Sequence, residues 1–169
     1  MSVLSNKEIR ILLSKEPPIV EDFLQLDLQL QSNGIDLTLR SVSAFLSLGQ
    51  LGLYNSDRIL PDSREINFGD GGFLMLGPGQ YRIIYNEIVN LPKDIIGLGF
   101  PRSSLLRCGA DIRTAVWDAG YSGRSESLLI VHNPHGLRLE LNSRLLQLVF
   151  FKLDSETGGY AGDFQRENT

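Results

Sequence analysis

The chain has 169 residues, of which 42% are hydrophobic and 21% are charged, and its formal net charge at pH 7 is −4. This length and composition are typical of one globular domain with a sizeable core, and the acidic balance excludes a uniformly basic surface for nucleic acid. The single cysteine, Cys108, excludes an internal disulfide and favours a reducing, cytoplasmic location.

The N-terminal segment is expected to form a short helix from Ser5 to about Lys15. Ser5 can cap it, Glu8 completes a capping box, and apolar residues recur on one face. Two consecutive prolines follow and end the helix. No apolar run here or later is long enough for a signal peptide or a membrane-spanning helix, so we expect no membrane partner.

Short strands separated by glycine and proline turns dominate the rest of the chain. Apolar and polar residues alternate in 25–31 and at the start of 34–46, and 68–85 predicts a strand, a Pro-Gly turn and a second strand. Further buried strands are expected at 94–100, 127–133 and 145–153. This pattern, with one or two short helices, predicts an all-β barrel or jelly-roll.

The stretch PRSSLLRCG (101–109) combines a short predicted helix with groups that bind phosphate. Guanidinium groups of Arg102 and Arg107 can chelate phosphate oxygens, and the hydroxyls of Ser103 and Ser104 can complete the site. The alternative is a serine helix cap followed by two solvated arginines.

Polar residues also interrupt otherwise apolar strands. The stretch RLLQL (144–148) contains an arginine and Gln147, and burying an amide costs free energy unless it has a partner. Asp36 in NGIDLTL (33–39) follows a glycine, and its alternative role is that of a turn-forming acid.

A tight, glycine-rich turn carries an acid and a phenol. In VWDAGYSG (116–123), Asp118 and Tyr121 are interspersed with glycines, which adopt backbone conformations that other residues resist. The pair can form a site, or the stretch can be an Asx-type turn with a packed ring.

Several familiar chemistries are absent from the sequence. One cysteine and two histidines, without a C-x-x-C pair, cannot build the zinc centre usual in nucleotide deaminases. The P-loop, the dinucleotide-binding fingerprint and the G-x-S-x-G nucleophile motif are also missing.

Four stretches resemble, in order and spacing, the motifs of the dUTPase and dCTP deaminase superfamily. They are GIDLTL (34–39), PRSSLLRCG (101–109), VWDAGYSG (116–123) and SRLLQLVF (143–150). The resemblance covers the whole chain. It implies a distorted β jelly-roll, a homotrimer with active sites between subunits, a deoxynucleoside triphosphate substrate and Mg²⁺.

The third motif is similar to that of dUTPases, I-D-x-x-Y-x-G. Asp118, Tyr121 and Gly123 match it, whereas Trp117 replaces the aliphatic residue. The resemblance implies that Asp118 orients the water that attacks the α-phosphorus, as a carboxylate base can do near a metal. It also implies that Tyr121 stacks beneath the deoxyribose and leaves no room for a 2′-hydroxyl.

The dCTP deaminases use a glutamate about three residues before an asparagine. Here Ile130 occupies that position, and the nearest acid, Glu126, lies on the same strand face but about 13 Å away. This argues against deamination. The ending GGYAGDFQREN, with Phe164-Gln165, nevertheless resembles the deaminase type, and the mixture resembles the monofunctional dUTPases of archaea.

The resemblance therefore implies a dUTP diphosphatase that makes dUMP and pyrophosphate, supplies dUMP and limits uracil in DNA. The alternatives are a zinc-independent dCTP deaminase, alone or bifunctional, and a non-catalytic nucleotide-binding jelly-roll. Asp118 is the expected catalytic residue, and Asp36 either braces its turn or reaches Mg²⁺ through water. The expected substrate-binding residues are Arg102, Ser103, Ser104, Arg107, Tyr121, Gln147, Phe164, Gln165 and Arg166.

We expect a β domain at 1–153 and a flexible, glycine-rich arm at 154–169. The arm carries Tyr160 and Phe164, which a free tail rarely needs. We expect it to close over bound nucleotide, with Phe164 against the base or sugar and Arg166 near the γ-phosphate. The alternative is that Phe164 packs on its own or a neighbouring subunit.

Overall fold

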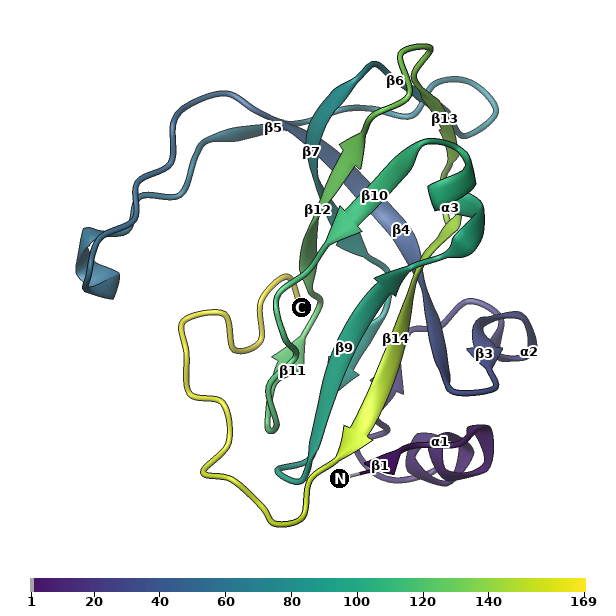
Figure 1. The fold of residues 1–169 in the computed structure, drawn as a ribbon, viewed down its shortest axis with the longest axis vertical. Coiled ribbons are helices and arrows are strands. Elements are labelled where there is room, and N and C mark those ends of the chain that lie inside the picture. Colours follow the sequence, from purple (N-terminus) through teal and green to yellow (C-terminus); the bar gives the residue numbers. More distant parts are fainter. Residues whose placement is uncertain (1) are drawn as a thin grey trace.

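The computed structural model describes residues 2–169, which form curled, mostly antiparallel sheets and a few short helices (Figure 1). The helical elements are α1 (Asn6–Leu13), α2 (Leu26–Gln29), α3 (Ser103–Arg107) and the 3₁₀ turn η1 (Asn55–Asp57). The strands are β1 (Ser2–Val3), β2 (Val20–Glu21), β3 (Leu30–Gln31), β4 (Gly34–Phe45), β5 (Ser63–Glu65), β6 (Phe73–Leu76), β7 (Gly79–Tyr85), β8 (Ile88–Asn90), β9 (Ile95–Pro101), β10 (Ala110–Arg113), β11 (Ser122–Gly123), β12 (Glu126–Val131), β13 (Leu137–Glu140) and β14 (Arg144–Lys152).

The largest sheet has the strand order β1-β14-β4-β7-β12-β10, with β3 and β5 also paired to β4 and β9 paired to β14. Two smaller sheets have the orders β11-β8-β2 and β13-β6. This arrangement is the predicted distorted jelly-roll. None of the helices in residues 2–169 is long and apolar enough to cross a membrane.

Helix α1 begins where the sequence predicts. The Ser5 hydroxyl accepts a hydrogen bond from the Glu8 amide at 3.4 Å, and the Glu8 carboxylate accepts one from the Ser5 amide at 2.8 Å. This reciprocal capping box satisfies amides that the first turn leaves without helical partners. The helix packs on the sheets through Ile9, which is fully buried.

The predicted strand at 25–31 is wrong for most of its length, because residues Leu26–Gln29 form α2 and only Leu30–Gln31 are extended. The side-chain oxygen of Gln29 accepts hydrogen bonds from the amides of Leu24 and Gln25 at 2.7 and 2.9 Å. These bonds satisfy amides at the start of the turn. The alternation of apolar and polar residues gives no sign of this helical turn, in which only Gln29 is buried.

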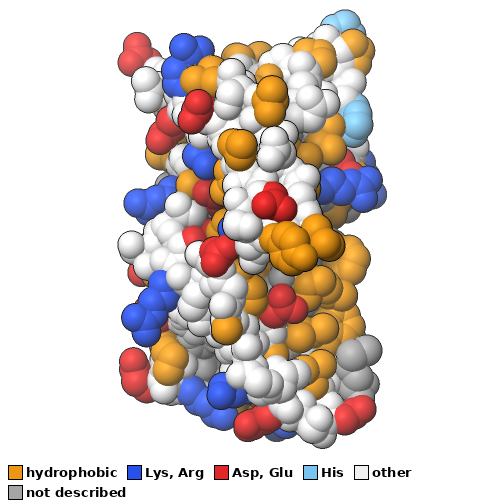
Figure 2. Space-filling model, turned by 90° about the vertical axis from the view of Figure 1, so that its left-hand side faces the viewer, with side chains coloured by type: hydrophobic (Ala, Val, Ile, Leu, Met, Phe, Trp, Pro, Cys, Tyr) orange, Lys and Arg blue, Asp and Glu red, His pale blue; other side chains and the backbone are white. Residues whose placement is uncertain are grey.

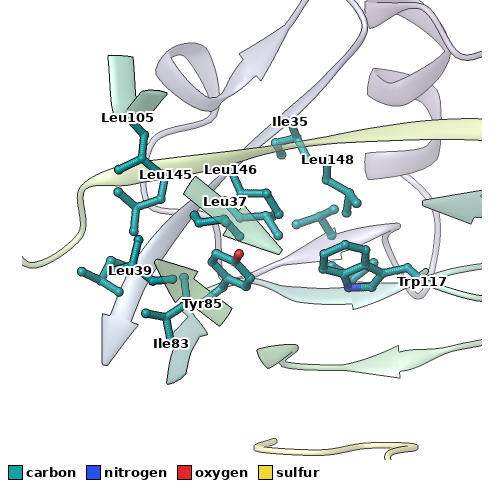
Figure 3. Packing of buried hydrophobic residues seen from close by; sticks show 14 of the residues in the cluster. Ile35, Leu37, Leu39, Ile83, Tyr85, Leu105, Trp117, Leu145, Leu146 and Leu148 are labelled. Atoms are coloured by element: carbon teal, nitrogen blue, oxygen red, sulfur yellow. The ribbon is translucent and has the colours of Figure 1, made fainter. Parts of the chain in front are cut away.

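Strand β4 is buried on both faces and organises the core. Ile35, Leu37 and Leu39 point into a cluster with Tyr85 and Leu146, and all five side chains are fully buried (Figure 3). Successive side chains of a strand alternate between faces. The opposite face of β4 therefore carries the buried polar residues between these positions, and the polar network and the candidate site are built there.

A buried carboxylate joins three segments on that face. Glu87 is 0% exposed, and its oxygens accept hydrogen bonds from Gln29 Nε2 at 2.7 Å, Thr38 Oγ1 at 2.6 Å and the Thr38 amide at 2.8 Å. Burial raises the pKa of Glu87 above its ordinary value, and the bonds from Thr38 and Gln29 oppose that rise. The network ties α2 and β4 to the turn before β8.

Glu87→Gln is expected to lower the free energy of unfolding by about 1–3 kcal/mol. The substitution replaces an acceptor oxygen with an NH₂ group, which then faces a donor of Thr38 or Gln29. Urea unfolding measures the loss, and the exposed acid Glu65 provides the control Glu65→Gln, which should change little. Equal stability of the two variants would contradict a structural role for the network.

Between β4 and β5, residues 46–62 leave the body of the protein as an arm (Figure 1). Backbone hydrogen bonds between Gln50 and Ile59 pair its two sides, at 2.8 and 2.9 Å. Leu48, Leu51 and Leu53 are 76, 83 and 87% exposed. Figure 2 views the protein from the side on which the arm projects, and hydrophobic side chains are visible on this face of the protein.

Candidate active site

The first group of predicted residues gathers where β9 ends and α3 begins. Arg102 Nε lies 2.9 Å from Asp36 Oδ2, and Arg144 Nη1 lies 3.4 Å from the same oxygen. Arg102 also donates to the backbone oxygen of Arg144 at 3.2 Å, and Arg144 donates to that of Leu28. We call Asp36, Arg102 and Arg144 the arginine cluster.

Asp36 is the buried centre of the arginine cluster, with 1% of its surface exposed. Burial raises the pKa of its carboxyl group, and the charges of Arg102 and Arg144 act in the opposite direction. Its Oδ2 atom already contacts both guanidinium groups. These contacts support the bracing role of Asp36 and do not support its use as a metal ligand, which stays a prediction.

Arg144 was not among the residues selected from the sequence. Its position in an apolar strand near Gln147 was the only signal there. Gln147 lies opposite Asp36 on β4 and opposite Phe100 on β9, so these three side chains share a face of the sheet. The pairing of β4, β9 and β14 thus brings together an acid, an arginine, and an arginine–amide pair from three segments that are distant in the sequence.

Helix α3 displays the remaining predicted phosphate ligands. Ser103, Ser104 and Arg107 are exposed, whereas Leu105 is buried and fixes the helix to the core. Two hydroxyls and one guanidinium therefore face solvent beside the arginine cluster. This set suits an anionic ligand with several oxygen atoms.

The second group gathers at the turn that leads into β11. Trp117 and Gly97 exchange backbone hydrogen bonds at 2.9 and 3.0 Å, which fixes the start of the turn on β9. Gly120 has a φ of +84°, and a Cβ atom there would lie 2.8 Å from the Cα of Gly159. Only glycine fits both the backbone conformation and this close approach.

Asp118 lies at a cleft of about 170 Å³. Its side chain is exposed, and no group in residues 2–169 donates a hydrogen bond to its carboxylate. The lining residues come from the turn, from the start of β12 and from the C-terminal segment: Ala115, Val116, Trp117, Asp118, Tyr121, Ser125, Glu126, Tyr160, Phe164 and Glu167. The carboxylate is thus available to a bound molecule.

Tyr121 forms a wall of this cleft and is 5% exposed. Its hydroxyl donates to Glu167 Oε1 at 2.8 Å, and its ring packs edge-on against Tyr160 with 5.7 Å between centroids. Burial is the main cause that raises the pKa of the Tyr121 phenol and the pKa of Glu167. Glu167 was not selected from the sequence, because only the fold brings the C-terminal segment to Tyr121.

The C-terminal segment 154–169 lies along the turn, bonded to its own chain. The amides of Tyr160 and Arg166 donate to the backbone oxygens of Ala119 and Ser122 at 2.8 and 2.7 Å. The side chain of Gln165 accepts from the Ser122 amide and donates to the Gly120 oxygen, both at 2.9 Å. Its treatment as an arm separate from a 1–153 domain stays a prediction.

The three predicted residues of this segment have different surroundings. Phe164 is 37% exposed and lines the Asp118 cleft. Gln165 and Arg166 instead line a larger cleft of about 630 Å³ between α1 and the turn. Of the three, only Phe164 lines the cleft of Asp118, whereas Tyr121 lines both clefts.

The two groups of residues lie apart. No hydrogen bond or ion pair within the described part of the chain connects the arginine cluster or α3 to Asp118, Tyr121 or Phe164. Trp117 is anchored at Gly97 of β9. Arg102, which directly follows the end of β9, comes five residues after Gly97, about 16 Å at the usual rise of a strand. Figure 1 shows the same separation between β11 and α3.

A family model described as dCTP deaminase-like matches residues 3–153. The chain belongs to this family. A relative from Methanosarcina mazei, named "Probable deoxyuridine 5'-triphosphate nucleotidohydrolase", is 45% identical over 170 residues, which cover 100% of this chain and 99% of the relative. A relative from Archaeoglobus fulgidus with the same name is 48% identical over 168 residues, with 99 and 98% coverage.

Among solved structures of this family's fold, the 2'-deoxycytidine 5'-triphosphate deaminase from Agrobacterium tumefaciens matches with a TM-score of 0.65. It is 21% identical, and the match covers 88% of this chain but 48% of the deaminase chain. This likeness confirms the predicted fold. The archaeal relatives confirm the predicted position of the chain within the superfamily, on the side of the archaeal nucleotidohydrolases.

Proposed function

We propose that this protein hydrolyses dUTP to dUMP and pyrophosphate. The observation that carries the proposal is the exposed Asp118 carboxylate at the mouth of a cleft walled by Tyr121. Asp118 can orient and deprotonate a water molecule for attack on the α-phosphorus, and the Tyr121 ring can contact the deoxyribose. Relatives of nearly the same length named as probable deoxyuridine triphosphate nucleotidohydrolases support this activity.

The triphosphate would contact α3 and the arginine cluster. Ser103, Ser104 and Arg107 offer exposed donors, and Asp36 holds the Arg102 guanidinium at 2.9 Å in one orientation. A fixed guanidinium binds phosphate with little loss of side-chain entropy. Gln147 lies on the same sheet face and can donate to a phosphate oxygen or read the base edge.

The proposal includes Mg²⁺ as an ion that is bound to the triphosphate of the substrate. The described residues contain no group of three or more His, Cys, Asp or Glu side chains arranged to hold a metal ion, and Asp36 is engaged by two arginines. The ion would come with the phosphates, on which it neutralises charge. The residues of this chain then bind the complex and position water.

The complete site would form between subunits of a homotrimer. Asp118 follows Trp117, which pairs with Gly97 of β9, and Arg102 comes five residues after Gly97, about 16 Å at the rise of an extended strand. This separation supports a site to which one chain does not bring both groups. A second copy can supply the missing group. The acidic, single-cysteine chain suits a cytoplasmic enzyme.

The direct experiment is product analysis by ion-exchange chromatography after incubation with dUTP and, separately, dCTP, each with Mg²⁺. dUMP and pyrophosphate from dUTP support the proposal. Absence of turnover with dUTP in the folded protein would reject it and favour the non-catalytic nucleotide-binding alternative.

The protein is expected not to release ammonia from dCTP. Ile130 occupies the position at which the dCTP deaminases have a glutamate. The nearest acid, Glu126, lies four residues earlier on β12. Glu126 already lies 3.6 Å from Arg82 and accepts from Asn168 at 3.2 Å. Ammonia release at a rate comparable with dUTP hydrolysis would contradict this, and its loss in Glu126→Gln would assign the chemistry to Glu126.

A further inference from the structure

The side chain of Arg58 joins the arm of residues 46–62 to the C-terminal segment. Its guanidinium forms an ion pair with Asp163, 105 residues away, and lies over the Phe164 ring with 4.8 Å between Cζ and the ring centroid. The Arg58 side chain is 23% exposed, although the arm around it is largely exposed. One cation thus engages two successive residues of the C-terminal segment.

The arm fixes the backbone at Arg58 by hydrogen bonds of its own. The Arg58 amide donates to the Asn55 oxygen at 3.1 Å, which closes η1, and Gln50 Nε2 donates to the Asp57 oxygen at 3.1 Å. Two-stranded hairpins are marginally stable alone. The contact with the C-terminal segment is therefore a support for the arm as well as for Phe164.

Phe164 is the residue through which Arg58 can influence the Asp118 cleft. Phe164 lines that cleft, whereas its neighbours Gln165 and Arg166 are bonded to the turn at Gly120 and Ser122. These bonds fix the backbone beyond Phe164 but leave its ring free to rotate away. The guanidinium stacked on the ring removes that freedom.

We propose that Arg58 is a positioning residue that holds Phe164 over nucleotide bound in the Asp118 cleft, so that the arm and the C-terminal segment cover the cleft together. The inference rests on the proposed function and adds a residue outside the four sequence motifs. A planar guanidinium can stack on a ring and pair with a carboxylate at the same time, which a lysine ammonium does less well.

Arg58→Ala is expected to raise KM for dUTP about fivefold and to leave kcat within about twofold, because the ring binds the nucleotide but does not touch the reacting atoms. Arg58→Lys should recover only part of the loss. The matched control is Arg138→Ala, because Arg138 stacks on Phe73 at 3.8 Å on the β13-β6 sheet. It should leave KM unchanged.

A double-mutant cycle tests whether Arg58 acts through Phe164. Phe164→Ala should raise KM, and adding Arg58→Ala should raise it no further. Additive effects of the two substitutions, or a KM for Arg58→Ala equal to that of the wild type, would overturn the inference. If Arg58→Ala does not fold, Asp163→Asn removes the ion pair without substituting any residue of the arm and is expected to raise KM as well.

Hydrogen exchange separates this inference from the proposed function. Without any nucleotide, Arg58→Ala should speed exchange of the amides of Asp163 and Phe164, the two residues that Arg58 contacts, relative to wild type and Arg138→Ala. Unchanged exchange would overturn the positioning role even in an active enzyme. A wild-type protein that does not hydrolyse dUTP but shows the faster exchange in Arg58→Ala would reject the function and retain the contact.

Discussion

Asp118→Asn is expected to lower kcat for dUTP hydrolysis by about 10²–10⁴-fold, the usual loss of one general base. The substitution keeps the shape of the side chain and removes its capacity to accept a proton. Asp118 is exposed at the cleft, and no group in residues 2–169 donates to its carboxylate. The loss should therefore reflect chemistry and not a damaged fold.

Single-turnover kinetics with dUTP and Mg²⁺ measure this effect, and thermal unfolding checks that the variant is folded. KM should change little, because the amide fills the same space. Asp70→Asn, in an exposed turn between β5 and β6, is the control for loss of one acidic charge. Turnover by Asp118→Asn at the wild-type rate would remove the basis of the proposed function.

A mixture of two inactive variants is expected to recover activity. Asp118→Asn changes the cleft beside β11, and Arg107→Ala changes α3, which lies apart from β11 in one chain (Figure 1). If each site takes Asp118 from one subunit and Arg107 from the next, random exchange of subunits restores about one site in four. Activity per chain should then reach about a quarter of the wild-type value.

The experiment requires co-expression of the variants or subunit exchange under mild denaturant, followed by measurement of dUMP formation. The matched control combines Asp118→Asn with Tyr121→Ala. These residues line the same cleft of one chain, so no pairing of subunits restores both. A shared site would be contradicted if the mixture of Asp118→Asn and Arg107→Ala recovered no activity. It would also be contradicted if sedimentation showed the fully active protein to be a monomer.

The sequence alone predicted the elements whose causes are local. The α1 capping box depends on two residues three positions apart, Ser5 and Glu8, and the structure contains both of its bonds. The strands β4, β9, β12 and β14 and the short helix α3 also lie where hydrophobic patterns and turn residues predict them. The family follows from four short motifs whose order is itself a property of the sequence.

Only the tertiary structure decided which distant groups meet. Asp36 contacts Arg102 and Arg144 because β4, β9 and β14 pair in one register, and Glu167 reaches Tyr121 because the C-terminal segment returns to the turn. Helix α2 replaces a predicted strand because Gln29 has buried partners on other segments. Local residue patterns fix backbone preferences, but side-chain partners far along the chain are chosen by packing and strand register. For that reason the sequence determined the fold class, the family and the motif residues, whereas the structure decided the surroundings of Asp36, the contact of Arg58 with Phe164 and the division of the candidate site into two parts.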